Sequence, residues 1–316
     1  MTIKVFAPAS IGNVSVGFDV LGMAVTPVGD ELLGDIVEIS AAVTDVSTLS
    51  LSGEFANKLP GDPKDNIVWH CLELFNKELI NSTKSVQPVD LVLEKKMPVG
   101  SGLGSSACSV VAALVALNEY YQKPFNDSDL LFMMGKMEAQ ISGSLHYDNV
   151  APCFLGGMQL MVTDTQVITR SLPTFDDYYW IMAYPGIEMS TKEARDALPK
   201  QYSRQDLISY GQTLATFIDA CYRNDPKQAF ANVVDVVAEP YRQSLLPKFI
   251  ETKQYLLANG ASAAGISGSG PTVFVACENK EIAEQLSNYL TENYLQSPTG
   301  FVHICKADTQ GARLVS

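Results

Sequence analysis

The sequence predicts an α+β protein made of two domains. Segments with helical periodicity alternate with short strand-like segments, and several of the strand-like segments follow one another in pairs. This pairing favours an α+β fold over a doubly wound parallel sheet. The composition becomes polar from Thr165 to Phe175, around Pro173. We therefore expect a boundary at about residue 165, with one domain over residues 1–165 and a second over residues 166–316.

The composition is that of a globular protein with a sizeable core. Of the 316 residues, 47% are hydrophobic and 18% are charged, and the formal net charge is -13. That charge argues against nucleic-acid and acidic-membrane partners, which need clustered Lys and Arg. No apolar run approaches the roughly 20 residues of a membrane span, so we expect a cytoplasmic protein. The six cysteines include no C-x-x-C pair, and we expect them to be buried and reduced.

The periodicity of the first half places its strands and helices. Strands are expected at Ile3–Ala7, Ile36–Ala42, Leu49–Leu51, Val89–Glu94 and Met158–Val162. Helices are expected from Asn66 to about Leu79, over Ser105–Tyr121 and over Asp127–Ile141. Asp65 or Asn66 would cap the first helix, and Asn126 or Asp127 the third.

The second half is placed in the same way. Strands are expected at Tyr179–Tyr184, Ala261–Ser267, Pro271–Cys277 and Gly300–Cys305. One helix starts after a cap at Ser190 or Thr191, and others are expected over Arg204–Arg223, Pro226–Val237, Leu246–Asn259 and Lys280–Asn293. Arg195 and Arg242 offer two guanidiniums for a carboxylate, although each taken singly is more often a surface ion-pair partner.

A loop rich in glycine and serine joins the strand Val89–Glu94 to the long apolar helix. Successive glycines let backbone N–H groups converge on one point, and the helix start adds unpaired donors and a positive dipole end. The loop therefore predicts a phosphate site, with a flexible connector capped by Ser105 as the alternative. A P-loop would need Lys after the last glycine, and a dinucleotide fingerprint would need glycine or alanine at Ser105. The loop reads Met97-Pro98-Val99-Gly100-Ser101-Gly102-Leu103-Gly104-Ser105-Ser106-Ala107.

Three further segments contain small or polar residues at high density. Pro8–Asp19 contains Asn13 and Asp19, which in the simplest interpretation bond their own backbone. Gly265–Thr272 lies between strand-like segments, so a tight hairpin is its simplest interpretation. Ser142–Asn149 collects several polar groups in a short stretch, and this density indicates a site.

Together the glycine loops resemble the signature motifs of the GHMP kinase superfamily. Within that superfamily the chain is most similar to the homoserine kinases, over essentially its whole length. Gly12 and Ser15 depart from an expected alanine and glycine, and Tyr147 from an expected proline. The matching segments are Pro8–Asp19, Pro98–Cys108, His146–Pro152, Gly265–Thr272 and Gly300–His303.

The resemblance implies a two-domain GHMP kinase fold. The N-terminal domain would contain a left-handed β-α-β-type nucleotide-binding unit, and the C-terminal domain would be α+β and ferredoxin-like. The implied reaction transfers the γ-phosphoryl group of ATP, with Mg²⁺, to the side-chain hydroxyl of L-homoserine on the route to threonine. A homodimer is expected from the resemblance and from the frequency of such assemblies.

The resemblance also implies roles for residues on the nucleotide side. The amides of Gly100–Ser106 would hold the phosphates. Ser106 and Glu138 would bind Mg²⁺ through hard oxygen ligands. Asn66, Ile67 and Val68 would form part of the adenine pocket.

On the acceptor side, the implied roles match the charges of an amino acid. Arg195, beside Thr191, and Arg242 would bind the carboxylate. Asp19 would bind the ammonium group, with Asn13 helping to orient it. His146 is placed like a substrate-contacting histidine.

The general base is left open by the sequence. Mevalonate-kinase-like relatives use an Asp, whereas homoserine kinases have Asn149 near its place, with Asp148 adjacent. We expect direct attack by the neutral hydroxyl oriented by Asn149, because a loose transition state gains little from early deprotonation. Asp148 as the base is the alternative.

Two other functions remain as alternatives. A kinase for another small alcohol, such as mevalonate or shikimate, would not need Arg195, Arg242 and Asp19 together. A non-catalytic nucleotide-binding or sensor protein could lose Ser106 or Glu138, and both are present.

Overall fold

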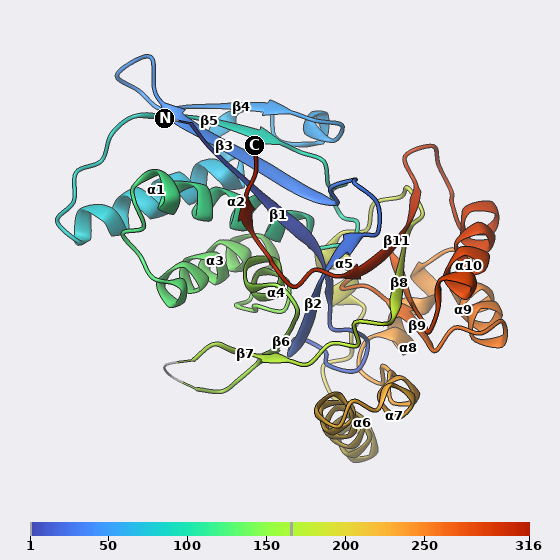
Figure 1. Ribbon diagram of the computed structural model, residues 1–316. Helices are drawn as coiled ribbons and strands as arrows, with labels where there is room; N and C mark the ends of the chain where they lie inside the picture. The colour runs from blue at the N-terminus through green and yellow to red at the C-terminus, as the bar shows by residue number, and fades with distance from the viewer. Residues whose placement is uncertain (1, 165–166) are drawn as a thin grey trace.

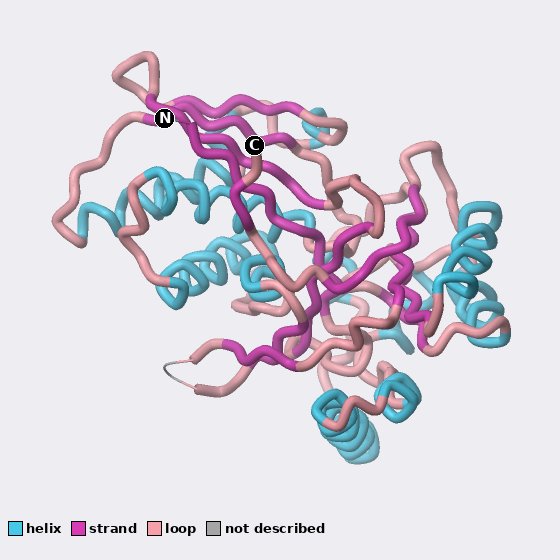
Figure 2. Tube along the Cα trace, viewed as in Figure 1, coloured by secondary structure: helices cyan, strands magenta, loops and turns pink. Residues whose placement is uncertain are grey.

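The structure, a computed structural model, describes residues 2–164 and 167–316. Its strands form one mixed sheet in the order β4-β5-β3-β1-β2-β11-β8-β10-β9, with β12 on β1, β6 on β2 and β7 on β6 (Figures 1 and 2). The expected boundary at residue 165 lies outside the described residues. The sheet joins the two halves of the chain where β2 pairs with β11.

The element bounds are as follows. The strands are β1 (Thr2–Gly12), β2 (Leu21–Pro27), β3 (Gly34–Ala41), β4 (Thr48–Ser52), β5 (Val89–Glu94), β6 (Met158–Met161), β7 (Thr169–Leu172), β8 (Tyr179–Tyr184), β9 (Ala263–Ile266), β10 (Val273–Cys277), β11 (Phe301–Ala307) and β12 (Arg313–Leu314). The α-helices are α1 (Ile67–Asn81), α2 (Ser105–Tyr120), α3 (Asp127–Ser142), α4 (Val150–Leu155), α5 (Thr191–Asp196), α6 (Arg204–Tyr222), α7 (Pro226–Ala231), α8 (Glu239–Arg242), α9 (Phe249–Ala258) and α10 (Lys280–Asn293). Short 3-10 helices lie at Ala56–Lys58, Pro63–Asp65 and Gln243–Leu245.

Helix α2 is the centre of the N-terminal half. It contacts β1 and β3 on one side and α1, α3 and α4 on the other (Figure 1). Its residues from Ala107 to Asn118 are all buried, as expected for a helix that is apolar all round. Next to it, β4 and β5 pair in parallel, with α1 on the connection between them.

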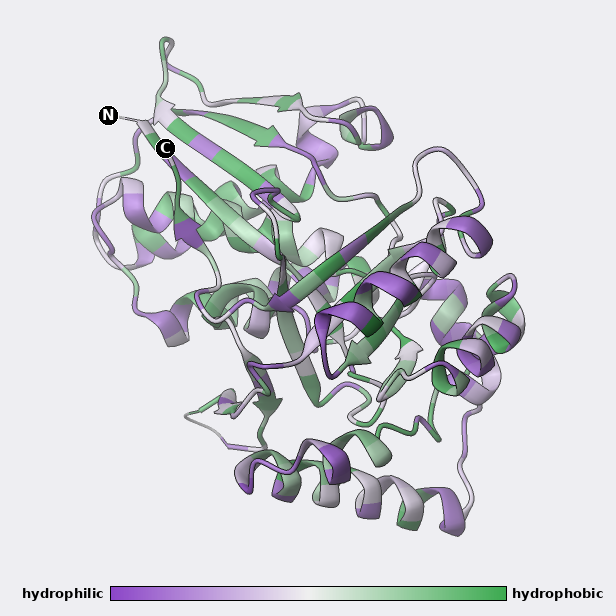
Figure 3. Cartoon of the chain, turned by 45° about the vertical axis from the view of Figure 1, so that its right-hand side comes forward, coloured by the Kyte–Doolittle hydropathy of each residue, from purple (hydrophilic) through white to green (hydrophobic). Residues whose placement is uncertain are grey.

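The C-terminal half has the ferredoxin-like arrangement. Its strands run β11-β8-β10-β9, which is the order 4-1-3-2 in chain numbering, and α9 and α10 lie on the connections. Alternate residues of β8 enter different cores, Trp180 and Met182 on one face and Ile181 and Ala183 on the other. Figure 3 shows mainly hydrophobic strands and outer helices with hydrophilic stripes. The predicted α+β two-domain fold is confirmed.

Two neighbouring strands differ from the sequence prediction. Pro8–Gly12, expected to open a loop, continues β1, which pairs with β3 as far as Pro8 and with β2 from Ala9 onward. Strand β2 was not predicted, because six of its seven residues are buried and its sequence shows no alternation. The buried N–H groups of Ala9 and Ser10 donate to the carbonyl oxygens of Leu33, at 2.9 Å, and Leu103, at 3.1 Å.

Several helix bounds also differ. The helix expected over Pro226–Val237 ends at Ala231, and the one expected from Leu246 begins at Phe249, after Lys248 with a φ of 60°. Helix α4 was not predicted, since it is a short element following a turn-rich stretch. The strands β7 and β12, short and partly exposed, were missed for a similar reason.

The cysteines behave as their apolar surroundings predict. All six are buried and free. Burial raises the pKa of the Cys221 and Cys277 thiols to about 12, which disfavours the reactive thiolate. None of the helices in the described part of the chain has the length and apolar character needed to cross a membrane.

Candidate active site

A cavity of about 600 Å³ collects most of the residues singled out from the sequence. Its wall includes the glycine loop before α2, the β1–β2 turn, the start of α5 and the β9–β10 hairpin. The predicted site residues that line it are Asn13, Asp19, Asn66, Ile67, Val99, Gly100, Ser101, Gly102, Gly104, Ser105, Ser106, Glu138, His146, Asp148, Asn149, Thr191, Arg195 and Arg242.

Five other predicted residues do not line the cavity. All five are buried: Val68, Met97, Pro98, Leu103 and Ala107.

The glycines of the loop adopt backbone conformations that suit only glycine. Gly100, Gly102 and Gly104 have φ values of 64°, 78° and 68°. A Cβ atom on Gly102 would lie 2.5 Å from the carbonyl oxygen of Ser267, so the loop packs directly on the β9–β10 hairpin. Gly104 is the N-cap of α2, and the alternative cap by Ser105 does not occur. Without a side-chain cap, the first N–H groups of α2 remain available to an anion.

Ser106 and Glu138 form a hydroxyl–carboxylate pair beside this loop. The Ser106 hydroxyl donates to Glu138 Oε2 at 3.1 Å. Burial raises the pKa of the Glu138 carboxyl group, against the opposing effect of the Ser106 hydrogen bond. Both groups are hard oxygen donors, and Mg²⁺ commonly uses one or two such protein ligands together with substrate phosphates. The donor set therefore fits the expected metal.

A chain of hydrogen bonds connects His146, Asp148, Asn149 and Ser10. His146 Nδ1 lies 3.1 Å from Asp148 Oδ1, and Asn149 Nδ2 donates to Asp148 Oδ2 at 3.1 Å. The Ser10 hydroxyl donates to Asn149 Oδ1 at 2.9 Å. Burial disfavours charge on His146, but the hydrogen bond and charge of Asp148 outweigh it and raise the histidine pKa. His146 Nε2 is buried without a partner among the described residues, so it is available to a ligand.

Asp19 and Arg195 meet in the same cavity. Arg195 donates from Nη1 to Asp19 Oδ2 at 3.2 Å and from Nη2 to Oδ1 at 3.0 Å. From the sequence, Asp19 and Arg195 are expected to bind opposite ends of one ligand, and their contact with each other was not predicted. The side chains of Arg195 and Asp19 remain 26% and 34% exposed, so a ligand has access to both.

The turn that carries Asp19 has a left-handed backbone. Asn13, Val14 and Ser15 have φ values of 71°, 45° and 56°. Asn13 Oδ1 accepts the backbone N–H of Asp19 at 2.8 Å, which is the local role considered in the sequence analysis. Ser15 thus occupies the conformation for which the family pattern has glycine.

Arg242 is more deeply buried than Arg195. At 3% exposed, it donates from Nε to the Ala194 carbonyl at 2.9 Å and from Nη1 to the Gly268 carbonyl at 3.0 Å. Burial lowers its pKa, and the charge of Asp235 partly offsets this effect. These contacts fix the guanidinium between α5 and the β9–β10 hairpin. Thr191, at the start of α5, also lines the cavity.

The predicted adenine residues lie at the start of α1. Asn66 Oδ1 accepts the Val68 N–H at 2.9 Å, which confirms Asn66 as the helix cap. Asn66 and Ile67 line the cavity, whereas the Val68 side chain is buried in the core. Apolar residues that the sequence analysis did not single out also line it: Leu59, Pro60 and Leu93.

Ser10, Asp35 and Lys95 are among the polar residues of the site that were not singled out from the sequence. Ser10 supports Asn149, and Lys95 lines the cavity while paired with the buried Asp35. The available signal was one charged residue at one end of each strand, Asp35 near the start of β3 and Lys95 directly after β5. Such positions are usually solvent-exposed, so the signal is weak.

Comparison with known proteins gives matches along the chain. The models for the GHMP kinases N terminal domain and the GHMP kinases C terminal domain match residues 66–157 and 217–296. A crystal structure of homoserine kinase from Cytophaga hutchinsonii is 32% identical, with a TM-score of 0.89, over 99% of this chain and 97% of that chain. The Methanococcus jannaschii mevalonate kinase shares the fold at 16% identity, with a TM-score of 0.70, over 97% of this chain and 98% of that chain.

The fold and these matches define an ATP-dependent kinase that acts on a small molecule. The cavity of this kinase contains the left-handed glycines before α2 and the Ser106–Glu138 pair. The chain belongs to the GHMP kinase family.

Proposed function

We propose that this chain transfers the γ-phosphoryl group of ATP to the side-chain hydroxyl of L-homoserine, giving O-phospho-L-homoserine. The observation that carries the proposal is the charge pattern of the cavity, where Asp19, Arg195 and Arg242 lie together with the phosphate loop. An α-amino acid needs groups of both signs, whereas mevalonate and shikimate carry a carboxylate and no ammonium group. The similarity to the Cytophaga homoserine kinase supports the same acceptor.

On the nucleotide side, the chain supplies backbone donors and a metal site. The amides of Gly100–Ser106 hold the phosphates at the start of α2. Ser106 and Glu138 hold Mg²⁺, which when bound neutralises charge on the phosphates. Asn66 and Ile67 contact the adenine.

On the acceptor side, Arg195 and Arg242 bind the carboxylate and Asp19 binds the ammonium group. Asn13 holds the turn that presents Asp19, while Thr191 and His146 complete the pocket. Asn149 orients the hydroxyl, whose oxygen forms a bond to the γ-phosphorus as the bond to the β,γ-bridging oxygen breaks and ADP leaves. The hydroxyl proton passes to an oxygen of the transferred phosphoryl group. Both oxygens of Asp148 are already hydrogen-bonded, which supports an orienting role and attack by the neutral hydroxyl.

The test is an ATP-consumption assay with single acceptors. L-Homoserine should stimulate turnover and yield a phosphate ester, while mevalonate and shikimate should not. Turnover with mevalonate would contradict the homoserine proposal. Intact Mg·ATP binding without turnover on any acceptor would favour the non-catalytic nucleotide-binding protein.

We also propose the cellular setting of this activity. The chain would act in the cytoplasm as a homodimer, without nucleic-acid or membrane partners. Light scattering on the purified protein tests the dimer.

A further inference from the structure

A buried polar cluster lies next to the phosphate loop. Asp35 is fully buried and Lys95 is 2% exposed. Lys95 Nζ lies 2.5 Å from Asp35 Oδ2 and donates to Ser109 Oγ at 3.0 Å. Ser109 in turn donates to Asp35 Oδ2 at 2.6 Å. The cluster thus connects β3, the end of β5 and α2.

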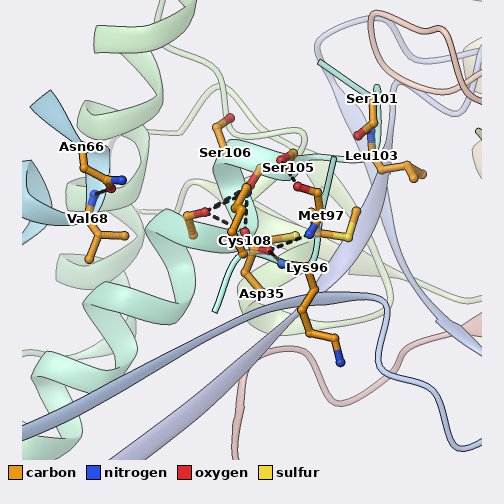
Figure 4. Close-up of polar contacts among 12 residues, drawn as sticks. Asp35, Asn66, Val68, Lys96, Met97, Ser101, Leu103, Ser105, Ser106 and Cys108 are labelled. Carbon is orange, nitrogen blue, oxygen red and sulfur yellow. Dashed lines mark hydrogen bonds and ion pairs between the residues drawn. The ribbon is translucent and has the colours of Figure 1, made fainter. Parts of the chain in front are cut away.

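The same two charged residues hold both ends of the loop. Where the loop leaves β5, Asp35 Oδ1 accepts the N–H groups of Lys96 and Met97 at 3.0 and 2.9 Å. Where the loop enters α2, Lys95 Nζ donates to the Ser105 carbonyl at 2.8 Å. Figure 4 shows Asp35, Lys96, Met97 and Ser105 gathered at the start of the helix.

The contacts of Lys95 determine how it can act. An ammonium group has three hydrogens, and here they are used by Asp35, Ser105 and Ser109. Its charge is matched by Asp35, so Lys95 does not serve as a free cation for phosphate. Any effect on the nucleotide passes through the backbone that Lys95 holds.

Stability alone does not explain a fully buried ion pair. The cost of removing both charges from water often exceeds their attraction, and apolar residues of similar size are frequently as stable. The pair does, however, fix geometry, because each partner also bonds the backbone at one end of a glycine-rich loop. A flexible loop can bind phosphate strongly only if its ends are held in place.

We propose that Asp35 and Lys95 are positioning residues for Mg·ATP. By holding Met97 and Ser105, they fix the loop amides relative to Ser106, the adjoining residue of α2. The bound phosphates and the metal-binding hydroxyl of Ser106 are thereby held at fixed positions relative to each other. This inference depends on the ATP-dependent kinase class and not on the identity of the acceptor.

The chain contains a matched control for this proposal. Asp308 is 3% exposed, and its Oδ1 accepts the N–H groups of Gln310 and Gly311 at 3.0 and 2.9 Å. Its Oδ2 pairs with Arg313 at 2.9 Å. Asp308 therefore makes the same kinds of contact as Asp35. Neither Asp308 nor its partners line the cavity, whereas Lys95 and Ser109, the side-chain partners of Asp35, do.

The experiment compares Asp35→Asn with Asp308→Asn. Both variants should unfold at a lower temperature than the parent. Only Asp35→Asn should weaken Mg·ATP binding, by about tenfold or more, because small displacements of a binding loop are costly. The dissociation constant is measured by calorimetry without any acceptor, so an error in the acceptor assignment does not affect it. Equal losses of affinity in the two variants would overturn the proposal.

The double variant Asp35→Asn/Lys95→Met tests the same proposal if the single variant does not fold. It removes both charges and should recover thermal stability. Because the contact from Lys95 to Ser105 is lost, Mg·ATP affinity should remain about tenfold or more below that of the parent. Parental affinity in this variant would show that the pair serves stability alone.

Discussion

The carboxylate of Asp19 and the guanidinium of Arg195 form a two-pronged ion pair, although 176 positions separate them in the chain. In the proposed function, an amino acid exchanges this pair for contacts with its own two charges. An alcohol with one charge would open the pair and leave one member unmatched, which is unfavourable in a partly buried site. The pair thereby favours acceptors that carry both charges.

Arg195→Ala tests the role of this pair. Loss of a charge-assisted contact should weaken transition-state binding by roughly 2–4 kcal/mol, lowering kcat/KM for homoserine by about 30-fold or more. Arg223→Ala is the control, because Arg223 forms an exposed pair with Asp219 at 3.8 Å on the surface of α6. Unchanged efficiency in Arg195→Ala would place Arg195 outside the acceptor site.

Asp148→Asn distinguishes an orienting group from a general base. If Asp148 orients His146 and Asn149, kcat should fall by less than about a hundredfold, since general bases contribute about that much or more. Mg·ATP affinity serves as the control and should not change. A collapse of kcat by several orders of magnitude with intact ATP binding would identify Asp148 as the base.

Glu138→Gln should stabilise the metal-free protein at neutral and higher pH. Burial raises the pKa of Glu138 above its ordinary value of 4.5. Above both the folded and unfolded pKa, the carboxylate is charged in both states but desolvated only in the folded one, so folding is penalised. Below 4.5 the group is neutral in both states and the penalty disappears.

Calorimetry of the parent and of Glu138→Gln in a chelating buffer shows which of the two proteins is the more stable at each pH. The variant should have the higher Tm at about pH 8, and the difference should shrink as the pH falls toward 4.5. A parent that is the more stable of the two at the higher pH would contradict the argument.

Gly135→Ala should destabilise α3 through its contact with Tyr147. An added Cβ atom would overlap the Tyr147 ring, and such overpacking typically costs about 1–3 kcal/mol. Gly211→Ala is the control, because Gly211 is also helical and has open space around it.

The double variant Gly135→Ala/Tyr147→Ala then measures the coupling. Removing the ring should relieve the clash, so the two changes should be less destabilising together than the sum of the single changes. Denaturant unfolding of all four proteins gives this value, and strict additivity would mean that the two residues do not interact.

Local signals account for the elements that could be predicted. Strand β5 alternates buried and half-buried residues, and α1 begins at its predicted cap, Asn66. Helix α3 begins at Asp127 and is capped by Asn126, which forms a capping box through a reciprocal pair of hydrogen bonds with Asp129. Strand β2 escaped prediction because burial on both faces removes the alternation that identifies a strand.

For the site, the loops and most polar residues could be predicted, but their partners could not. The glycine pattern indicates a phosphate site through local backbone chemistry. The pairing of Lys95 with Asp35 joins residues 60 positions apart. No local preference specifies such a contact, which depends on how β3 and β5 are placed beside α2.

The position of β11 has a consequence for biosynthesis. The path through the sheet from β2 to β8 passes through β11, Phe301–Ala307. During synthesis on the ribosome, Asp19 and Arg195 are both in place in the chain well before β11 emerges. Strand β11 is the one that joins the N-terminal and C-terminal halves of the sheet. Until then β2 lacks this neighbour, and unpaired strand edges are where nascent chains associate wrongly. The cavity that contains Asp19 and Arg195 is thus among the last parts of the molecule to be assembled.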